Sequence, residues 1–282
     1  NISDYLIYVL LATVCDVMPL RKLNRLIALN ALKNFDITKN SPINTLFKLN
    51  EKKNRININD LGFLIGPILN AGGRLGKSQY ATELLSSSND LVVNDRSKSL
   101  IKLNDKRKEI ENLILEEIDF KNIELENKDV IIYYNPNINE GLIGIIAARL
   151  KDYFNKPSIV ITASNKLLKG SARSVYNYNI GRVIKNSLDQ KIILNGGGHN
   201  MAAGFTLNKE KLKNFENYIL EDFLKLNILN SNKFLYESEI SSLAFNQDFY
   251  DDIKKLEPFG TGNPVPTFLL RDLKIIKSTI LN

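Results

Sequence analysis

The spacing of apolar residues predicts that the first part of the chain is helical. Residues 3–14 read as a buried helix that leads into Asp16 and ends at Pro19. Asn40–Ser41–Pro42 is a helix-start signal, because proline is tolerated in the first turn of a helix. A further helix is expected over Asn24–Phe35, with helical spacing at Leu23, Leu26, Ile27, Leu29 and Leu32. Another is expected over Asp60–Ile68, and a turn at Asn70–Ala71–Gly72–Gly73 closes it.

A long and highly charged helix is expected from Asn94 to Ile118. Its apolar positions are Leu100, Ile101, Leu103, Ile110, Leu113 and Ile114. The length and the solvated character of this helix suit a bridge between two domains.

Beyond residue 129, short apolar runs alternate with helical spacing. Strands are expected over Val130–Tyr134, Ser158–Thr162, Leu167–Ala172, Lys191–Leu194 and Ala202–Leu207, and helices over Leu142–Phe154, Ile180–Leu188 and Lys209–Leu226. This alternation predicts a small α/β domain of roughly 100 residues. After the polar, linker-like stretch Asn227–Asn232, the runs Phe234–Ile240 and Phe268–Ile276 read as strands of a third, β-rich unit that is incomplete here.

Composition narrows the class of protein. The 282 residues are enough for two domains, and no apolar run approaches the roughly 20 residues that a membrane-spanning helix needs. The single cysteine, Cys15, excludes an internal disulfide framework and a cysteine-based zinc site, and it fits a reducing cytoplasm. The net charge of +7 and the pI near 9.2 favour an anionic partner, of which nucleic acid is the commonest, although heavy use of Lys, Asn and Ile explains the charge equally well.

The glycine run Gly196–Gly197–Gly198 followed by His199 is the strongest local feature. Three glycines let main-chain N–H groups approach an anion closely, and His199 is the only histidine of the chain. A histidine beside such a loop can hydrogen-bond a phosphate or lie near a metal-activated water. The alternative is a flexible turn with an incidental histidine.

Ser171 and Arg173 lie two residues apart on an expected strand, so their side chains share one face. A hydroxyl and a bidentate guanidinium make a suitable pair for a phosphate. Judged alone, the same pattern fits an edge strand with a solvated arginine.

Asp16 stands in the apolar segment TVCDVMPL, where a buried carboxylate has to be paired, hydrogen-bonded or metal-bound unless it caps a helix. Arg74 follows the expected turn, Arg107 lies on the long helix, and each alone is more often a surface residue. The segment 257–264 is a turn by composition. The chain has no P-loop, GxGxxG, GxSxG or HExxH motif, which disfavours nucleotide-driven motors, dinucleotide oxidoreductases and zincins.

Taken together and in order, these segments resemble the RecJ family of the DHH phosphoesterase superfamily. The matching blocks are TVCDVMPL (13–20), LNAGGRLG (69–76), LNDKRKEIE (103–111), GLIGIIAARL (141–150), KGSARS (169–174), GGHNMAAGF (197–205) and LEPFGTGNPVPTF (256–268). Seven blocks across nearly the whole chain are far more specific than any one of them.

The resemblance implies an α/β fold in four parts. Residues 1–90 would be the C-terminal part of a DHH domain, 91–120 a connecting helix, 121–228 the DHH-associated domain, and 229–282 the start of an oligonucleotide-binding (OB) barrel. It also implies hydrolysis of single-stranded DNA from its 5′ end with Mn²⁺ or Mg²⁺, in recombination and repair.

The same resemblance implies roles for individual residues. Asp16 would be a metal ligand, while Ser171, Arg173 and the Gly196–His199 loop would bind phosphate, with His199 also acting in catalysis. Arg74, Arg107 and Asn70 would hold the 5′-terminal phosphate or the adjacent backbone.

Two departures from the family pattern stand out. The Asp-His-His triplet and the other metal-binding aspartates are absent, so we expect this polypeptide to be inactive alone and to be a piece of a longer enzyme. Residues 138–141 lack the histidine that many relatives carry there, so no role is transferred to it. The alternatives are another DHH phosphoesterase, such as an oligoribonuclease or a nucleotide phosphatase, and a non-catalytic nucleic-acid-binding remnant.

Overall fold

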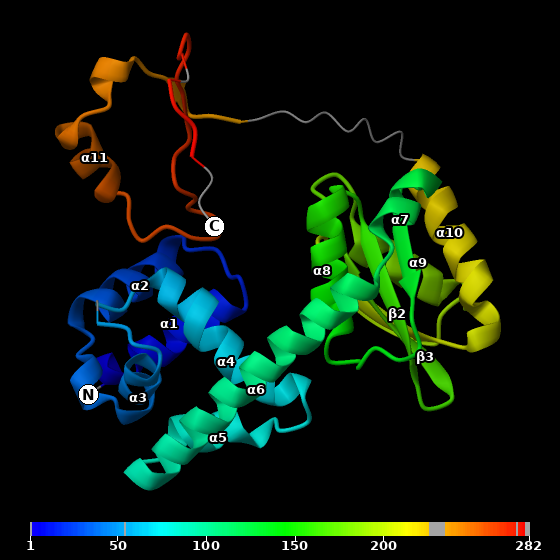
Figure 1. The fold of residues 1–282 in the computed structure, drawn as a ribbon, viewed down its shortest axis with the longest axis horizontal. Helices are drawn as coiled ribbons and strands as arrows, with labels where there is room; N and C mark the ends of the chain where they lie inside the picture. The colour runs from blue at the N-terminus through cyan, green and yellow to red at the C-terminus, as the bar shows by residue number, and fades with distance from the viewer. Residues whose placement is uncertain (1, 54, 226–234, 275, 280–282) are drawn as a thin grey trace. The chain divides into compact units, whose positions relative to one another are not determined.

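The computed structural model describes residues 2–53, 55–225, 235–274 and 276–279. It divides into two compact units (Figure 1). The first comprises Asn1–Leu69, Glu83–Ser97 and Ser231–Asn282, and the second comprises Asn70–Thr82 and Lys98–Asn230. The long helix α6 (Asp90–Glu117) contributes residues to both units and begins four residues earlier than the sequence predicts.

The predicted helices of the first ninety residues are present. They are the 3₁₀ turn η1 (Ile2–Tyr5) with α1 (Leu6–Cys15), α2 (Lys22–Asn34), the 3₁₀ turn η2 (Ile37–Lys39), α3 (Ser41–Leu49), the π-helix η3 (Asp60–Ile65), α4 (Gly66–Arg74) and α5 (Gln79–Ser86). The start signal of α3 is confirmed, because the Asn40 side chain accepts a hydrogen bond from the Ile43 N–H at 3.0 Å. Helix α5 was not predicted.

Two details of these helices differ from the prediction. The turn expected at Asn70–Gly73 is wrong, because α4 continues through it to Arg74. Gly72 serves packing instead, since a Cβ there would lie 2.6 Å from the Lys77 carbonyl oxygen. The leucines of α2 are largely exposed, and this helix buries Ala28 and Ala31.

The second unit is built on a five-stranded mixed sheet with the order β1-β2-β3-β5-β4. Its strands are β1 (Ile131–Tyr134), β2 (Ser158–Ser164), β3 (Leu167–Arg173), β4 (Asn195–His199) and β5 (Ala202–Leu207). Strands β1 and β2 are parallel, and the other neighbours are antiparallel. The helices are α6, α7 (Phe120–Glu126), α8 (Ile143–Phe154), α9 (Ile180–Asp189) and α10 (Leu212–Lys225), with the 3₁₀ turn η4 (Lys209–Lys211) before α10.

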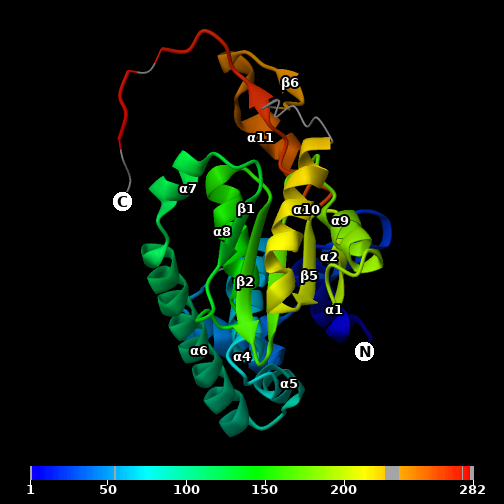
Figure 2. The same cartoon turned by 90° about the vertical axis from the view of Figure 1, so that its right-hand side faces the viewer.

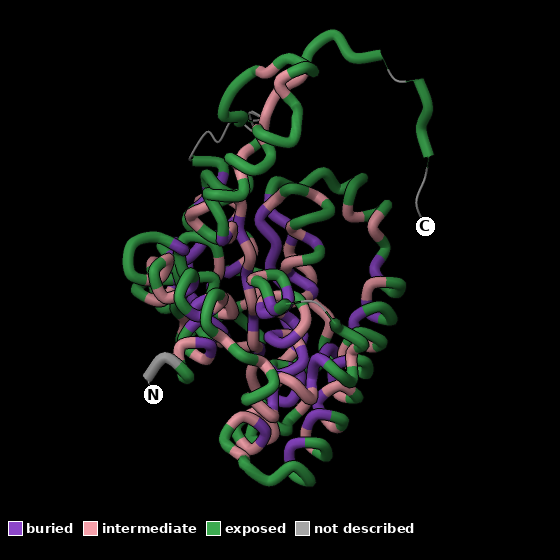
Figure 3. The backbone as a smooth tube through the Cα atoms, turned by 90° about the vertical axis from the view of Figure 1, so that its left-hand side faces the viewer, coloured by how far each residue is buried: buried purple, intermediate pink, exposed green. Residues whose placement is uncertain are grey.

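Apolar residues on both faces of the sheet bury it between helices. On one face, the side chains of α9 and α10 form a core around Phe205 and Phe215. On the other face, α8 and the C-terminal end of α6 pack against Ile131 and Val160. Figure 2 shows α8 and α10 on opposite sides of the strands, and Figure 3 shows where buried, intermediate and exposed positions lie along the backbone.

One predicted strand is displaced. The apolar run Lys191–Leu194 is a turn after α9, and the strand is the glycine run Asn195–His199. Ile192 and Ile193 are buried in the core without being paired in the sheet. The glycines pair because a sheet ladder needs backbone groups rather than side chains, so the expected Gly196–His199 loop is an edge strand.

The described residues from 235 onward contain little regular structure. Strands β6 (Ser238–Glu239) and β7 (Phe268–Leu269) pair in parallel, with the 3₁₀ turn η5 (Ser242–Ala244) and α11 (Gln247–Lys254) between them. The strands are shorter than predicted, and α11 was not predicted. Phe234, Ile275 and the expected linker 227–232 lie outside the described residues. No helix in the described part of the chain is long and apolar enough to cross a membrane.

Candidate phosphate-binding site

Ser171 and Arg173 lie on β3, which is a central strand rather than an edge strand. Ser171 pairs with Val160 of β2 on one side and with Gly204 of β5 on the other, and Gly204 in turn pairs with Gly197 of β4. Paired residues in a sheet point to the same face. Ser171, Gly204 and Gly197 therefore form one row across three strands.

The next row places Arg173 and His199 on the same face of the sheet. Arg173 pairs with Ala202, and Ala202 pairs with His199. Two strand spacings separate Arg173 from His199, or about 10 Å at the usual ~4.8 Å per strand. His199 is exposed, and its Nδ1 accepts a hydrogen bond from the Met201 N–H at 3.4 Å.

Helix α8 covers only part of this face, and its first turn lies on Ser171 and Arg173. A Cβ on Gly144 would lie 3.1 Å from the Ser171 Oγ and 3.0 Å from an Arg173 Nη, so glycine lets the helix lie close to both side chains. Arg173 donates to the Ser171 Oγ at 3.2 Å and to the Ala172 carbonyl at 2.9 Å. The N-cap residue of α8 is Leu142, whose side chain cannot accept from the first N–H groups. These groups add the positive end of the helix dipole to the site.

Arg74 reaches the same helix start from α4. Its Nη1 donates to the Gly141 carbonyl at 3.0 Å, two residues before α8 begins. Gly141 packs directly on the end of α4, since a Cβ there would lie 2.3 Å from the Arg74 carbonyl oxygen. Gly141 thus contacts Arg74, and Gly144, three residues later, contacts Ser171 and Arg173.

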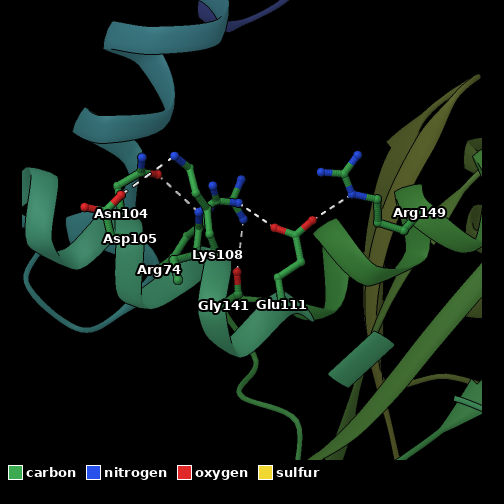
Figure 4. A network of polar contacts seen from close by, with 8 residues as sticks. Arg74, Asn104, Asp105, Lys108, Glu111, Gly141 and Arg149 are labelled. Atoms are coloured by element: carbon green, nitrogen blue, oxygen red, sulfur yellow. Dashed lines mark hydrogen bonds and ion pairs between the residues drawn. The ribbon is translucent and has the colours of Figure 1, made fainter. Parts of the chain in front are cut away.

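Arg107 is held in place by Glu111. Its Nη1 donates to Glu111 Oε2 at 2.7 Å, and its Nε donates to Asn104 Oδ1 at 3.2 Å. The other carboxylate oxygen of Glu111 accepts from Arg149 Nε at 2.7 Å (Figure 4). The Arg107 and Glu111 side chains are only 12% and 4% exposed, whereas Arg149 is 58% exposed.

Arg74, Arg107 and Arg173 form what we call the arginine cluster. The pKa of the Arg74 guanidinium lies below its ordinary value, first because burial disfavours the charge and then because Arg107 and Arg173 repel it, with Glu111 acting in the opposite sense. Burial also lowers the pKa of Arg173. The cluster therefore has more positive charge than its carboxylate balances, and a bound anion would relieve the repulsion.

Beside the cluster, two glycines leave an open shelf on the sheet. No described residue lies within 4 Å of a Cβ built on Gly197, and the nearest atom to one on Gly204 is 3.9 Å away. Glycine weakens a strand, and in a strand interior it often marks a place that a ligand approaches closely. By contrast, Gly196 and Gly198 are required by packing, because their Cβ atoms would lie 2.8 Å from Ile193 and 2.3 Å from the Ala202 carbonyl.

Asn70 and Asp16 are the remaining predicted residues. Asn70 is exposed one turn before Arg74 on α4. Asp16 belongs to the first unit, where it is exposed at the C-terminal end of α1, so the expected burial is wrong. Among the residues that the structure describes, no group of three or more His, Cys, Asp or Glu side chains could hold a metal ion. The described residues thus do not form a complete metal site.

Sequence reasoning missed the residues that support the arginines, namely Glu111, Arg149, Gly141 and Gly144. One signal was available for Glu111, because it stands four residues after Arg107 on a helix, where an acid and a base face each other. Arg149 lies 38 residues from Glu111, so the sequence alone gives no sign of that contact.

The α/β unit and the segment after it match known domain families. Residues 127–225 match the DHHA1 domain, and residues 236–282 match the RecJ OB domain. The fold therefore defines a DHH-associated domain followed by an OB-type segment.

Relatives named single-stranded-DNA-specific exonuclease RecJ match most of the chain. The Haemophilus influenzae protein is 33% identical, and the match covers 95% of this chain and 49% of the relative. The Bacillus subtilis protein is 29% identical, with 93% of this chain and 34% of the relative covered. The crystal structure of Thermus thermophilus RecJ with Mn²⁺ has the same fold, with a TM-score of 0.82 and 23% identity over 95% of this chain and 40% of that one. The chain is similar to RecJ proteins over most of its own length, and it spans half or less of the length of these relatives.

Proposed function

We propose that the protein is a single-stranded-DNA-specific 5′→3′ exonuclease, and that its second unit binds the phosphates of the strand. The arginine cluster beside the open glycine shelf is the observation that carries this proposal. An anionic backbone lying across Gly197 and Gly204 would meet no side chain at these two positions and would come within reach of the guanidinium groups. The names of the relatives support the same reading over a nucleotide phosphatase or an oligoribonuclease.

Each residue of the site has a definite part in this proposal. Arg173 offers a fork of N–H donors, Ser171 offers a hydroxyl, and the first turn of α8 offers backbone N–H groups to the same phosphate. Arg74 and Arg107 neutralise the terminal phosphate or the adjacent one. His199, exposed on the same face, can donate a proton or a hydrogen bond to an oxygen of the reacting phosphate.

Divalent metals enter the proposal through the relatives. Structures of Thermus thermophilus RecJ contain Mn²⁺ or Mg²⁺. Such ions neutralise phosphodiester charge and activate a water. We propose that Asp16 contributes one carboxylate. The described residues supply no further carboxylate, histidine or cysteine to complete a cluster of ligands for such an ion.

The cellular setting follows from the family. We propose a role in DNA recombination and repair in the cytoplasm, a reducing compartment that suits a chain with one cysteine, Cys15.

The full-length gene product, supplied with Mn²⁺, tests the proposal on single-stranded DNA labelled at one end or the other. We expect mononucleotides from the 5′ end, and at least a tenfold loss of rate in Arg173→Ala, given about 1.5–3 kcal/mol for a hydrogen bond to a charged group. Arg182→Ala is the matched control, because Arg182 lies on α9 and pairs with Asp222. Cleavage of free nucleotides alone, binding without hydrolysis, or equal losses in both variants would each contradict the proposal.

A further inference from the structure

The segment 256–263, which carries the sequence block LEPFGTGN, docks on the chain that follows Asp16. We call residues 256–263 the bracket and residues 16–21 the Asp16 turn. Both belong to the first unit. The chemistry proposed above gives the bracket no role.

The bracket is closed on itself. Gly260 and Asn263 exchange two backbone hydrogen bonds, of 2.9 and 3.0 Å. The Asn263 side chain donates to the Leu256 carbonyl at 3.0 Å and to the Pro258 carbonyl at 2.9 Å. A loop with its own internal bonds presents its remaining carbonyl groups in a fixed arrangement.

The Asp16 turn binds directly to this arrangement. The Leu20 N–H donates to the Thr261 carbonyl at 2.6 Å, and Arg21 Nε donates to the Gly262 carbonyl at 2.6 Å. The buried Leu20 side chain packs on Gly260, where a Cβ would lie 2.7 Å from its Cδ1. Gly262 has a φ of +74°, a conformation that glycine adopts without strain.

Arg25 binds the N-terminal end of the bracket. Its Nη2 donates to the Leu256 carbonyl at 2.8 Å and to the Glu257 carbonyl at 2.9 Å, and its Nη1 lies 3.5 Å from the Pro258 carbonyl. The guanidinium groups of Arg21 and Arg25 therefore donate hydrogen bonds to backbone carbonyls of the bracket. This basic pair anchors the bracket.

Two observations show why this anchor matters. Val17, next to Asp16, has a φ of +55°, which is unfavourable for a β-branched residue. Backbone hydrogen bonds at the end of α1 hold this conformation, from the Val17 N–H to the Val14 carbonyl at 3.1 Å and from the Met18 N–H to the Thr13 carbonyl at 2.9 Å. The bracket binds the residues that follow, Leu20 and Arg21. Pro258 is the only buried residue among the described positions from 235 to 279, so the bracket is the place where this segment is held.

We propose that the bracket is a positioning element for Asp16, with Arg25 as its principal anchor. The bracket fixes Leu20 and Arg21 at one end of the Asp16 turn, while the hydrogen bonds at the end of α1 fix the other end, and together they limit the directions open to the Asp16 carboxylate. This assignment rests on the proposed function in one respect, namely that Asp16 takes part in catalysis. It also means that the OB-type segment contributes to the geometry of the first unit as well as to any strand binding.

Hydrogen exchange of the full-length protein tests the anchor directly. In Arg25→Ala we expect the amides of Val17, Met18, Leu20 and Arg21 to exchange ~tenfold faster or more, because local opening no longer has to release the bracket. Arg25→Lys should show a smaller increase, since an ammonium reaches fewer of the three carbonyls. The matched control is Arg55→Ala, because Arg55 also donates to two backbone carbonyls, at the end of α2. Equal exchange in Arg25→Ala and wild type would overturn the proposal.

Kinetics and salt dependence complete the test. We expect Arg25→Ala to lower kcat while KM for single-stranded DNA and the salt dependence of binding stay unchanged. A fall of about 0.7 in the salt slope would instead identify Arg25 as a phosphate contact. If Arg25→Ala does not fold, Asn263→Ala loosens the bracket from within, and its exchange at 17–21 decides the matter. Asp16→Asn distinguishes the catalytic role of Asp16 from the anchoring role of the bracket. Full activity of this variant would refute the catalytic role, whereas the hydrogen exchange of Arg25→Ala would still report on the anchor.

Discussion

Glu111 Oε2 lies 2.7 Å from Arg107 Nη1, in a pair whose side chains are 4% and 12% exposed. The carboxylate fixes the arginine on α6. Burial lowers the pKa of the nearby Arg74 guanidinium most, and the charge of Arg107 lowers it further. A buried acid thus sets the geometry of a basic site. Without it, Arg107 would be a buried cation with Asn104 as its remaining partner.

Replacing Glu111 with Gln should therefore destabilise the second unit. Removing one partner of a buried ion pair leaves the other charge uncompensated and costs roughly 3 kcal/mol. Urea unfolding measures this cost as a fall in the free energy of unfolding. Arg149→Ala is the comparison, because Arg149 is 58% exposed and its pair with Glu111 should contribute less than ~1 kcal/mol. Equal losses in the two variants would show that Glu111 does not anchor Arg107.

At the glycine shelf, one substitution should affect the stability of the protein and its binding of single-stranded DNA in opposite directions. Gly204→Ala should keep or raise stability, by up to ~0.5 kcal/mol, because its Cβ has room and alanine orders the strand better. The same methyl group should weaken binding of single-stranded DNA, because it occupies the shelf that the backbone would approach. Thermal unfolding and fluorescence anisotropy measure the two effects.

Gly170→Ala is the matched control for that substitution. Gly170 lies on β3 with its Cβ position 2.0 Å from the ring of buried Phe205, so the substitution forces the core apart and should cost about 1–3 kcal/mol. A Gly204→Ala protein that binds DNA as wild type does would argue against the shelf.

Sequence patterns predicted the α/β unit well, because its strands carry buried β-branched residues and its helices carry amphipathic spacing. These patterns failed where the buried side chains and the paired backbone belong to different residues. Ile192 and Ile193 look like a strand because they are buried, yet the ladder forms at Gly196–Gly198, whose lack of side chains hides the strand from any pattern of hydrophobicity. The turn expected in α4 failed for a related reason, since Gly72 is there for close packing.

The site was predictable residue by residue but not as an assembly. Ser171 and Arg173 share a face because strands alternate, which the sequence alone predicts. The approach of Arg74 depends on Gly141 and on the start of α8, contacts that span 67 residues. The roles of these residues, and the division of the chain at residues 90, 120 and 228, stay predictions.

Arg173 should account for about one phosphate contact. Neutralising one phosphate of a single strand contributes ~0.7 to the slope of log affinity against log salt, so Arg173→Ala should lower the slope by about that amount. Arg173→Lys should keep the slope and lose affinity, because an ammonium cannot form the bidentate fork. Titrations at several salt concentrations measure both. An unchanged slope in Arg173→Ala would remove this residue from the strand contacts.

The last prediction concerns Tyr178, whose side chain is fully buried in the core between the sheet, α9 and α10. Burial raises the pKa of its hydroxyl above the ordinary 10.0, and the nearby Asp222 carboxylate raises it further, while Arg182 acts in the opposite direction. The folded protein therefore holds this proton more tightly than the unfolded chain. Its contribution to stability is complete below pH 10.0 and is lost as the pH rises above that value, with a limiting slope of ~1.4 kcal/mol per pH unit.

Tyr178→Phe should flatten that alkaline decline, because phenylalanine has no proton to lose. Tyr218, whose pKa is also raised by burial, keeps part of the decline in the variant. Tyr176→Phe is the control, since Tyr176 is 92% exposed. Urea unfolding on either side of pH 10.0 is compared between each variant and wild type, so that contributions common to both proteins cancel. Parallel curves for wild type and Tyr178→Phe would show that the buried hydroxyl does not govern alkaline stability.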